Sequence, residues 1–465
     1  MIKLGGKRIP MREQDAEQRK SNFFSVPHGY SEEEVITEAQ RCLQCQGAPC
    51  EKHCPINMRI LDMIRAIAVG DFKKAFFIAK EDNSLPAITG RVCPQESQCE
   101  GVCPFAQSGE GINIGKLEAF VADWAKEKEL KKDIFIQENP ERIAVIGAGP
   151  AGITCAVDLR KYGFQVTLFE ALHKAGGVLQ YGIPAFRLPT EIVDAEITYL
   201  DELGVDLQLN FFVGQNITFD ELRRRFDAIF IGSGAGAPLF MRIEGENLKG
   251  VYSANEFLIR CNLMKSYNSA EFDTPIVCGD RVGIIGAGNV AMDAARCARR
   301  LGSEHVHILY RRTKKESPAR IEEIEHALEE GIILEELVTP KRIVGDKNGW
   351  VSGVELLRMK LSAPDKSGRP RPVPLENSEF IMPIDTIIEA LGTQPNRLFL
   401  NRAEGLDIDS WGLIKVDDDL QTSIPGVYAG GDAIRGNATV ILAMGDGRKA
   451  ARAIGRQMKR LSSSS

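Results

Sequence analysis

"RIAVIGAGPAGITCAVDLRKYGFQVTLFE", residues 142–170, decides the fold of this chain. An apolar strand turns through Gly147, Gly149 and Gly152 into a helix, and a second strand ends at Glu170. A GxGxxG turn in this setting is typical of a dinucleotide-binding βαβ unit, because glycines let the backbone approach a pyrophosphate. The helix N-terminus adds partial positive charge, and an acid about 20 residues further on can bind a ribose hydroxyl. The stretch therefore predicts a nucleotide site.

The unit repeats in "RVGIIGAGNVAMDAARCARRLGSEHVHILYRR", residues 281–312, where Ala291 takes the place of the third glycine. Its second strand ends in two arginines instead of an acid. A guanidinium at this point suits the 2′-phosphate of NADP, whereas an acid would repel it. The alternative is that the arginine pair is only a solvated strand end. The predicted NADP(H)-binding residues are Gly286, Gly288, Asn289, Val290, Arg311 and Arg312.

The C-terminal stretch "GVYAGGDAIRGNATVILAMGDGRKAA", residues 426–451, indicates a flavin. A strand ends at Asp432, which can accept hydrogen bonds from ribityl hydroxyls, and a following helix N-terminus can stabilise negative charge on a reduced flavin. Two dinucleotide units in one chain then favour a flavoprotein that binds NADPH. The predicted FAD-binding residues are Gly147, Gly149, Gly152, Glu170, Gly177, Gly431, Asp432, Ala438, Thr439 and Val440.

Two glycine-bearing strands, "IFIGSGAGAP" (229–238) and "IIEALGTQPN" (387–396), resemble crossings between the two nucleotide domains. We therefore expect an α/β fold in which the NADP domain is inserted into the FAD domain. The expected domains are a helical domain (1–137), the first part of the FAD domain (138–280), the NADP(H) domain (281–390) and the second part of the FAD domain (391–465).

Seven of the 11 cysteines precede residue 104, in "RCLQCQGAPCEKHCP" (41–55) and "GRVCPQESQCEGVCP" (90–104). Clustered cysteines in a reducing compartment are more often metal ligands or catalytic groups than disulfides. Zinc is one reading, since CxxC pairs are common zinc ligands. Cysteine followed by proline, which occurs three times here, recurs instead in ferredoxin-type [4Fe–4S] binding. The capping box at Ser31 predicts a helix that runs towards Cys42. The helical spacing on either side of Gly70 and Asp71, between 58 and 80, predicts two short helices.

Two cubane clusters need eight ligands, one more than these cysteines supply. The stretch "INIGKLEAFVADWA" (112–125) predicts a helix in which Glu118 lies among small and apolar neighbours. A carboxylate buried there would be costly unless it were paired or ligated. The alternative is a surface glutamate that reaches solvent.

These features together resemble the glutamate synthase small subunit family over nearly the whole chain. Its relatives include the large subunit of NADH-dependent reduced ferredoxin:NADP oxidoreductase, the sulfide dehydrogenase large subunit and the N-terminal half of dihydropyrimidine dehydrogenase. The most specific stretches are "LPAITGRVCPQESQCEGVCP", "INIGKLEAFVAD" and "GGVLQYGIPAFRLP". The stretch "FFSVPHGYSEEEVITEAQRCLQC" is most similar to the ferredoxin:NADP branch.

The resemblance implies two [4Fe–4S] clusters with interleaved ligands. One cluster would be held by Cys42, Cys45, Cys50 and Cys103, and the other by Cys54, Cys93, Cys99 and Glu118. The resemblance also implies that Arg187 lies near the reactive edge of the flavin, where its charge could stabilise an anionic ring; a surface arginine is the alternative. The remaining thiols show no CxxC spacing, and packing is their expected role.

The expected function is hydride exchange between NADP(H) and FAD, with single electrons passing through the clusters to or from a second flavoprotein or iron–sulfur subunit. That partner would be ferredoxin-reductase-like, or the large subunit of glutamate synthase if the chain supplies electrons for glutamate synthesis. A non-catalytic iron–sulfur and nucleotide-binding scaffold is the alternative of another class.

The composition and the hydropathy of the chain bear on its partners and its location. The net charge of −6 argues against a nucleic-acid partner. No apolar stretch reaches about 18 residues, so no membrane span is expected. The N-terminal stretch lacks the apolar core of a signal peptide, and we expect a soluble, cytoplasmic protein.

Overall fold

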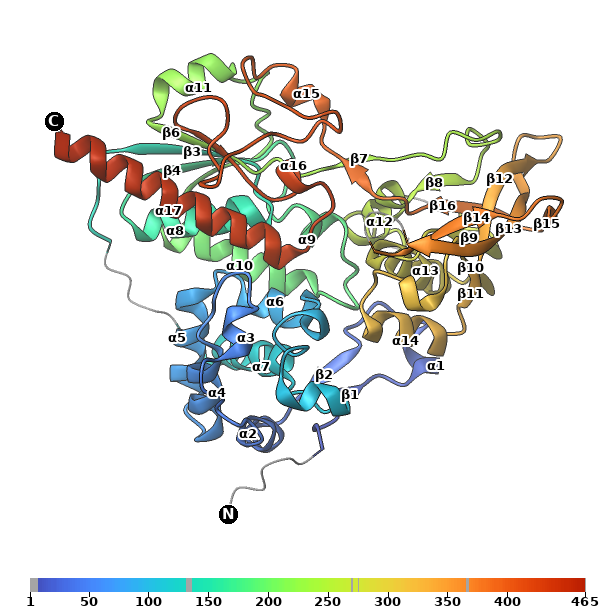
Figure 1. The fold of residues 1–465 in the computed structure, drawn as a ribbon, viewed down its shortest axis with the longest axis horizontal. Helices are drawn as coiled ribbons and strands as arrows, with labels where there is room; N and C mark the ends of the chain where they lie inside the picture. Colours follow the sequence, from blue (N-terminus) through green and yellow to red (C-terminus); the bar gives the residue numbers. More distant parts are fainter. Residues whose placement is uncertain (1–6, 131–135, 269–270, 275, 365–367, 465) are drawn as a thin grey trace.

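The computed structural model describes residues 7–130, 136–268, 271–274, 276–364 and 368–464. A helical region near the N-terminus occupies the bottom of Figure 1, with one α/β domain above it and a second α/β domain beside both. The long C-terminal helix α17 crosses in front of the first α/β domain.

Short helices build the N-terminal region, as the sequence predicts. α2 begins with the expected capping box, in which the Glu34 N–H donates to Ser31 Oγ (3.2 Å) and the Ser31 N–H donates to the Glu34 carboxylate (2.6 Å). A cap at Asp71 separates the two helices predicted between 58 and 80. The helices are α2 (Glu32–Gln40), α3 (Pro49–Lys52), α4 (Ile60–Ala68), α5 (Phe72–Asp82), α6 (Pro86–Val92) and α7 (Ile114–Glu127).

The first α/β domain contains a parallel five-stranded sheet in the order β18-β6-β3-β4-β5. The edge strand β18 comes from the C-terminal part of the chain, after all strands of the second α/β domain, so the second domain is inserted within the first. The strands are β3 (Arg142–Ile146), β4 (Gln165–Phe169), β5 (Asp206–Gln208), β6 (Ala228–Ile231) and β18 (Val427–Ala429). The helices include α8 (Pro150–Lys161), α10 (Thr190–Glu202) and α17 (Val440–Ser464).

The second α/β domain has a parallel sheet in the order β8-β16-β9-β10-β11. It matches the first sheet except at the edge strand, because β8 precedes the other strands of its domain in sequence whereas β18 follows those of the first. β8 precedes the expected boundary at residue 281 and nevertheless lies in this sheet, so the domain extends N-terminally of that boundary. The strands are β8 (Val251–Ser253), β9 (Arg281–Ile285), β10 (His305–Tyr310), β11 (Ile333–Glu336) and β16 (Thr386–Glu389). The helices are α12 (Ala254–Asn262), α13 (Asn289–Arg300) and α14 (Ile321–Glu329).

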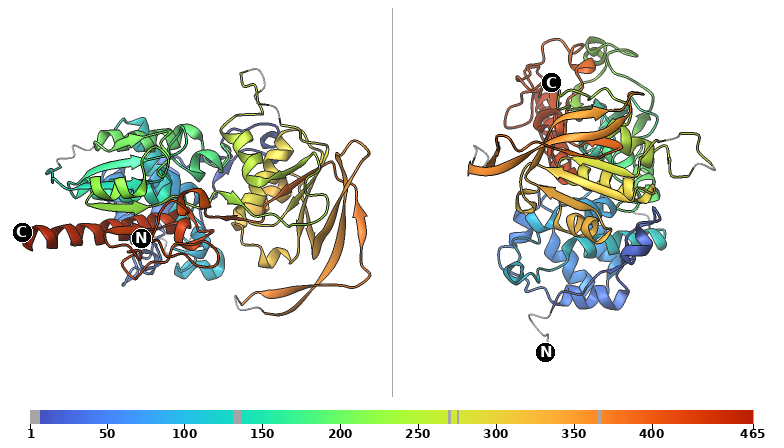
Figure 2. Two further views of the ribbon diagram at one scale, coloured as in Figure 1. Left: turned by 90° about the horizontal axis from the view of Figure 1, so that it is seen from above. Right: turned by 90° about the vertical axis from the view of Figure 1, so that its right-hand side faces the viewer.

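An antiparallel sheet, which the sequence did not predict, covers the outer side of the second domain (Figure 2). It consists of β12 (Val338–Gly345), β13 (Val351–Pro364), β14 (Pro370–Pro374) and β15 (Phe380–Met382). Between the two α/β domains, β7 (Ala237–Pro238) pairs antiparallel with β17 (Thr393–Gln394). This pair lies on the two stretches that the sequence predicted as crossings.

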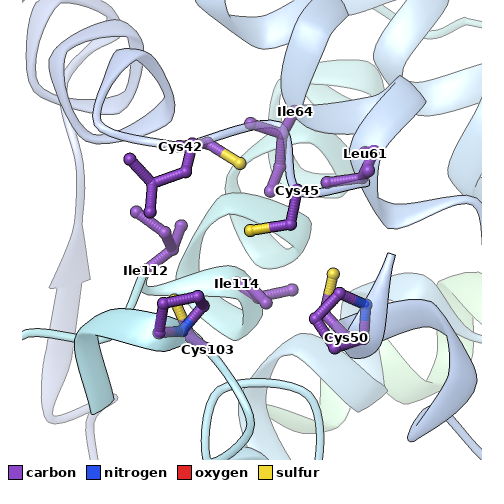
Figure 3. Close-up of a pocket in the computed structure, with 11 residues that line it drawn as sticks. Cys42, Cys45, Cys50, Leu61, Ile64, Cys103, Ile112 and Ile114 are labelled. Carbon is purple, nitrogen blue, oxygen red and sulfur yellow. The ribbon is translucent and has the colours of Figure 1, made fainter. Parts of the chain in front are cut away.

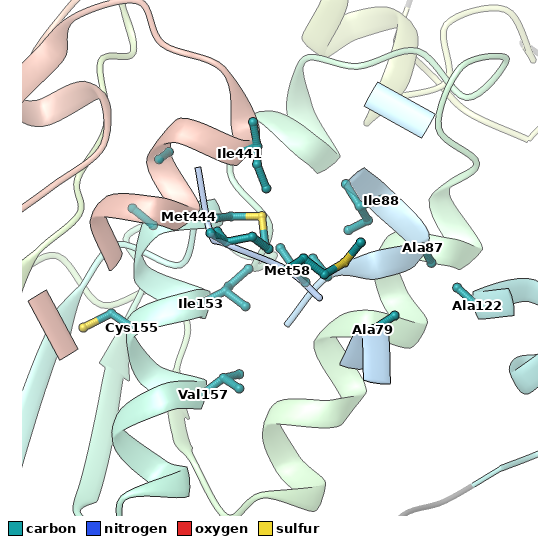
Figure 4. Close-up of a cluster of buried hydrophobic side chains, with 14 of the residues drawn as sticks. Met58, Ala79, Ala87, Ile88, Ala122, Ile153, Cys155, Val157, Ile441 and Met444 are labelled. Atoms are coloured by element: carbon teal, nitrogen blue, oxygen red, sulfur yellow. The ribbon is translucent and has the colours of Figure 1, made fainter. Parts of the chain in front are cut away.

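The helical region packs directly on the first α/β domain. Figure 4 shows Met58 and Ile88 from the helical region together with Ile153 of α8 and Ile441 and Met444 of α17. These side chains belong to one buried apolar cluster that spans both regions. The cysteine-bearing region is therefore fixed against the first nucleotide-binding fold.

The segment that precedes α2 leaves the helical region and lies against the second α/β domain. It contains β1 (Arg12–Glu13), α1 (Ala16–Arg19) and β2 (Pro27–Gly29). Arg19 forms a buried ion pair with Glu330, 3.0 Å away. Among the described residues, no helix combines the length and the apolar character needed to cross a bilayer.

Candidate functional site

Four thiols from three segments converge in an apolar pocket. Cys42 and Cys45 follow α2, Cys50 lies in α3, and Cys103 precedes a short 3₁₀ turn. Figure 3 shows their sulfur atoms around a common space that is lined by Leu61, Ile64, Ile112 and Ile114. We call these four residues the Cys42 set. Three of its four thiols are partly exposed, so this set lies near the surface.

Burial raises the pKa of Cys50 to about 12 and also raises the pKa of Cys42. Four protonated thiols in an apolar pocket gain little from one another, whereas a bound metal centre would stabilise them as thiolates. The donor set, four sulfurs without a histidine, fits zinc or an iron–sulfur cluster equally in chemical type.

The second group, here the Cys54 set, consists of Cys54, Cys93, Cys99 and Glu118. Burial raises the pKa of Cys93, and the neighbouring charges of Glu118, Cys99 and Cys54 raise it further. The charge of Glu118 also raises the pKa of Cys54, and the charges of Cys54 and Glu118 raise that of Cys99. The structure thus brings together the four residues that the resemblance assigned to a second cluster.

Glu118 is buried on α7, with 6% of its surface exposed, so it is not a glutamate that reaches solvent. Its Oε1 accepts hydrogen bonds from Asn83 Nδ2 (2.6 Å) and Thr89 Oγ1 (2.9 Å). Burial raises its pKa to about 8. A mixed set of three sulfurs and one carboxylate is compatible with ligation of a metal centre, which would offset the cost of burying the charge. Sequence reasoning missed Asn83 and Thr89, because neutral polar residues carry no spacing signal.

The first nucleotide turn has the close backbone approach that its glycines predict. Gly147 has φ +97°, and a Cβ there would lie 2.5 Å from the Gly232 carbonyl oxygen. Gly149 caps α8 and faces open space, which leaves room for a phosphate above the helix N-terminus. Gly177, at φ +54°, lies against Gly149. These glycines form a cradle that side chains would fill, and it fits a dinucleotide.

Glu170 lies at the end of β4 and is buried, with a pKa that burial raises. Its carboxylate accepts the Ala148 and Leu172 N–H groups, both at 2.9 Å. The acid is therefore fixed beside the turn by the backbone, before any ribose is bound.

The C-terminal glycine motif lies on the same domain. Asp432 Oδ1 accepts the Ala438 N–H at 3.0 Å, and this bond fixes the approach to α17. Burial raises the pKa of Asp432 to about 6. Gly431 has φ +67°, which explains why a glycine precedes the aspartate. Thr439 and Val440 follow at the start of α17, where the helix dipole is positive.

The second nucleotide turn has Gly286 at φ +118° and Gly288 at the start of α13. Val290 is 42% exposed, on the open side of the turn. The two arginines differ: Arg311 is exposed, whereas Arg312 is buried and its Nε donates to the Pro370 carbonyl oxygen at 2.9 Å. Arg311 therefore has the freer head group for a phosphate.

Arg187 is buried, which excludes the surface-loop alternative. Its Nη1 donates to both carboxylate oxygens of Asp293 (2.8 and 2.7 Å), and its Nε lies 2.9 Å from Glu323. Both acids belong to the second α/β domain, so Arg187 joins the two nucleotide-binding domains. A role at the flavin edge stays a prediction. Sequence reasoning missed Asp293 and Glu323, because each lies more than 100 residues from Arg187 in the chain.

Comparison with known families divides the chain as the structure does. Residues 19–130 match the family described as dihydropyrimidine dehydrogenase domain II, 4Fe-4S cluster. Residues 141–447 match the pyridine nucleotide-disulphide oxidoreductase family.

Relatives that match over most of this chain agree with this division. The chain is 34% identical to the glutamate synthase [NADPH] small chain of Escherichia coli, over 93% of each chain. It is 37% identical to the NADP(+)-dependent formate dehydrogenase subunit beta of Moorella thermoacetica, over 89% of this chain and 60% of that one. Among solved structures, FprA from Mycobacterium tuberculosis in complex with NADPH is 18% identical with a TM-score of 0.58, over 70% of this chain and 86% of that one. That likeness shows the fold.

Proposed function

Because the chain belongs to the glutamate synthase small-chain family and contains a pyridine nucleotide-disulphide oxidoreductase domain, we propose that it is an NADP(H)-dependent FAD and iron–sulfur oxidoreductase. Its cofactor sites are assigned as follows. NADP(H) binds at Gly286–Val290 and Arg311, and FAD binds across the first α/β domain. Two [4Fe–4S] clusters bind at the Cys42 and Cys54 sets. Bound flavin supplies exchange between a two-electron hydride and single electrons.

The observation that carries this proposal is the position of the Cys54 set. Pro55, which follows Cys54, contacts α17 so closely that a Cβ on Gly445 would lie 3.0 Å from its carbonyl oxygen. α17 begins beside the predicted flavin ring, at Val440. The Cys54 set therefore lies next to the flavin domain, whereas the Cys42 set lies near the surface.

This order supports a path for single electrons between the flavin site and a partner, which runs through the Cys54 set and then the Cys42 set. Leu43, which lines the Cys42 pocket, is 38% exposed and offers an apolar contact there. The partner in this proposal is a second flavoprotein or iron–sulfur subunit, as in NADH-dependent reduced ferredoxin:NADP oxidoreductase. Electron supply to a glutamate synthase large chain is the second candidate, and the E. coli relative favours it.

The test uses the chain purified without oxygen. We expect about eight irons and as many acid-labile sulfides per chain, as two [4Fe–4S] clusters require. We also expect the flavin absorbance to bleach at far lower NADPH than NADH concentrations, because Arg311 can bind the 2′-phosphate. Zinc in place of iron would contradict the cluster assignment, and equal responses to the two nucleotides would contradict the NADP assignment.

The two partner candidates are separated by the acceptor. NADPH-dependent glutamate formation with an added glutamate synthase large chain would favour the second candidate. Oxidation of two NADPH coupled to reduction of one NAD+ and of two one-electron ferredoxins, with a ferredoxin-reductase-like subunit added, would favour the first.

A further inference from the structure

The segment between β10 and α14 is fastened to the second nucleotide turn. The Arg320 N–H donates to Asn289 Oδ1 at 3.0 Å. Ser317 Oγ donates to the Ala287 carbonyl oxygen at 2.7 Å. Both acceptors lie in the turn that is predicted to bind NADP(H), so the segment that carries Arg320 follows the position of that turn.

The Arg320 side chain leaves its own domain and enters the helical region. It is buried, with 7% of its surface exposed. Its Nη1 donates to the Arg91 carbonyl oxygen (2.8 Å), and its Nη2 donates to Gln95 Oε1 (3.2 Å). Arg91 and Gln95 flank Cys93, a member of the Cys54 set. One guanidinium thus holds the chain on both sides of a predicted cluster ligand.

The hydrogen bonds continue from Gln95 to Glu118. Gln95 Nε2 donates to the Thr89 carbonyl oxygen at 3.1 Å, and Thr89 Oγ1 donates to Glu118 Oε1 at 2.9 Å. Gln95, Thr89 and Glu118 are all buried, so water does not compete for these bonds. An unbroken path therefore runs from Asn289 in the nucleotide turn to the carboxylate of the Cys54 set.

Arg320 also brings a positive charge to this site. It forms an ion pair with Glu322 (2.8 Å), which Lys116 shares at 2.9 Å, and its Nε lies 3.6 Å from Glu96. The two cations and two carboxylates balance one another. Even so, the buried head group of Arg320 lies against the chain on both sides of Cys93. A cation held there favours negative charge at the ligand segment.

We propose that Arg320 is a positioning residue that joins the NADP(H) turn to the cluster of the Cys54 set. It holds the Arg91–Gln95 segment in place and stabilises the one additional negative charge that this cluster carries after accepting an electron from reduced flavin. This inference rests on the proposed function. A cation that stabilises the reduced state raises the reduction potential, so its removal lowers the potential of this cluster and leaves the cluster of the Cys42 set unchanged.

The test compares Arg320→Gln and Arg320→Lys with the wild-type holoprotein in an anaerobic dithionite titration followed by EPR. We expect one of the two cluster signals to move to lower potential in Arg320→Gln, and a smaller shift in Arg320→Lys. Lysine keeps the charge but loses the forked hydrogen bonds. Arg260→Gln is the matched control, because Arg260 pairs with Glu256 on an exposed helix face far from Cys93 in sequence.

Unchanged potentials in both variants, or equal shifts of both clusters, would overturn the inference. If Arg320→Gln loses iron, Arg320→Lys decides: a shift confined to one signal supports the inference, and no shift overturns it. A wild-type chain without iron, or without bleaching by NADPH, would instead overturn the proposed function.

Discussion

The turn at Gly147 and the turn at Gly286 each follow the first strand of a parallel βαβ unit, yet the second strands of the two units lead to opposite charges. β4 leads to Glu170, a buried carboxylate that two backbone N–H groups hold beside the turn. β10 leads to Arg311, an exposed guanidinium. A ribose hydroxyl is a neutral donor and suits a fixed acceptor, whereas a phosphate carries charge that a flexible surface cation can meet from solvent. In the proposed assignment, the same βαβ unit therefore binds two different nucleotides, and the residue after the second strand is one of the positions that distinguish them.

The turns also differ in how closely the backbone approaches itself. A Cβ on Gly152 would overlap the Gly147 carbonyl oxygen, whereas the matching position in the second turn is already the buried alanine Ala291. In the first domain α17 also packs on α8, and Gly447 lies so close to the Ala151 carbonyl oxygen that it has no room for a side chain. At this third position the first turn is therefore more tightly packed, and it should tolerate less change there.

The largest effect is expected for Gly152→Ala. The added methyl group must displace a backbone carbonyl, which opens the turn under the pyrophosphate, and we expect FAD affinity to fall ~100-fold or more. Flavin content after purification measures this, with circular dichroism to verify folding. The matched control is Ala291→Gly, for which we expect an NADPH affinity within about fivefold of wild type, since only helix propensity changes. Full flavin content in Gly152→Ala would show that the two turns are equally tolerant.

A smaller effect is expected for Arg311→Gln. Loss of a charge-assisted bond to the 2′-phosphate should weaken NADPH binding about 10- to 100-fold. NADH binding should change by less than about twofold, because NADH lacks that phosphate. Titration of flavin bleaching with each nucleotide measures both. A parallel loss for NADPH and NADH would mean that Arg311 supports the domain instead of selecting the nucleotide.

Local patterns predicted much of the fold. The two glycine turns, the capping box at Ser31 and the break at Asp71 each depend on residues within a few positions of one another, so the sequence shows them directly. The antiparallel sheet that contains β13 and the placement of β8 in the second sheet depend on pairing between distant strands. Neither follows from local periodicity, and both were missed or misplaced.

The residues of the candidate site likewise fall into those that the sequence reveals and those that only the folded structure reveals. Cysteines and glycines reveal themselves by type and spacing, and the family resemblance gave the interleaved sets that the structure brings together. The partners that fix them are ordinary residues at long range: Asn83 and Thr89 for Glu118, and Asp293 for Arg187, which is 106 positions away. Such pairs become visible only after the helices are packed.

The smallest effect concerns the pH dependence of FAD binding at Asp432. Burial raises its pKa to about 6, with a further contribution from Asp446. The ionised carboxylate is the better acceptor for ribityl hydroxyls, so FAD affinity should fall as pH drops through about 6, by several-fold between about pH 7 and 5.

Stability of the flavin-free chain should respond in the opposite direction. Because the folded pKa lies above the unfolded value, the folded state binds the proton more tightly, and this contribution to stability is lost as pH rises through about 6. Fluorescence titration of the flavin-free chain with FAD, with thermal unfolding across the same pH range, measures both trends. Asp432→Asn should remove both steps, and a variant that retains either one would assign that step to another group.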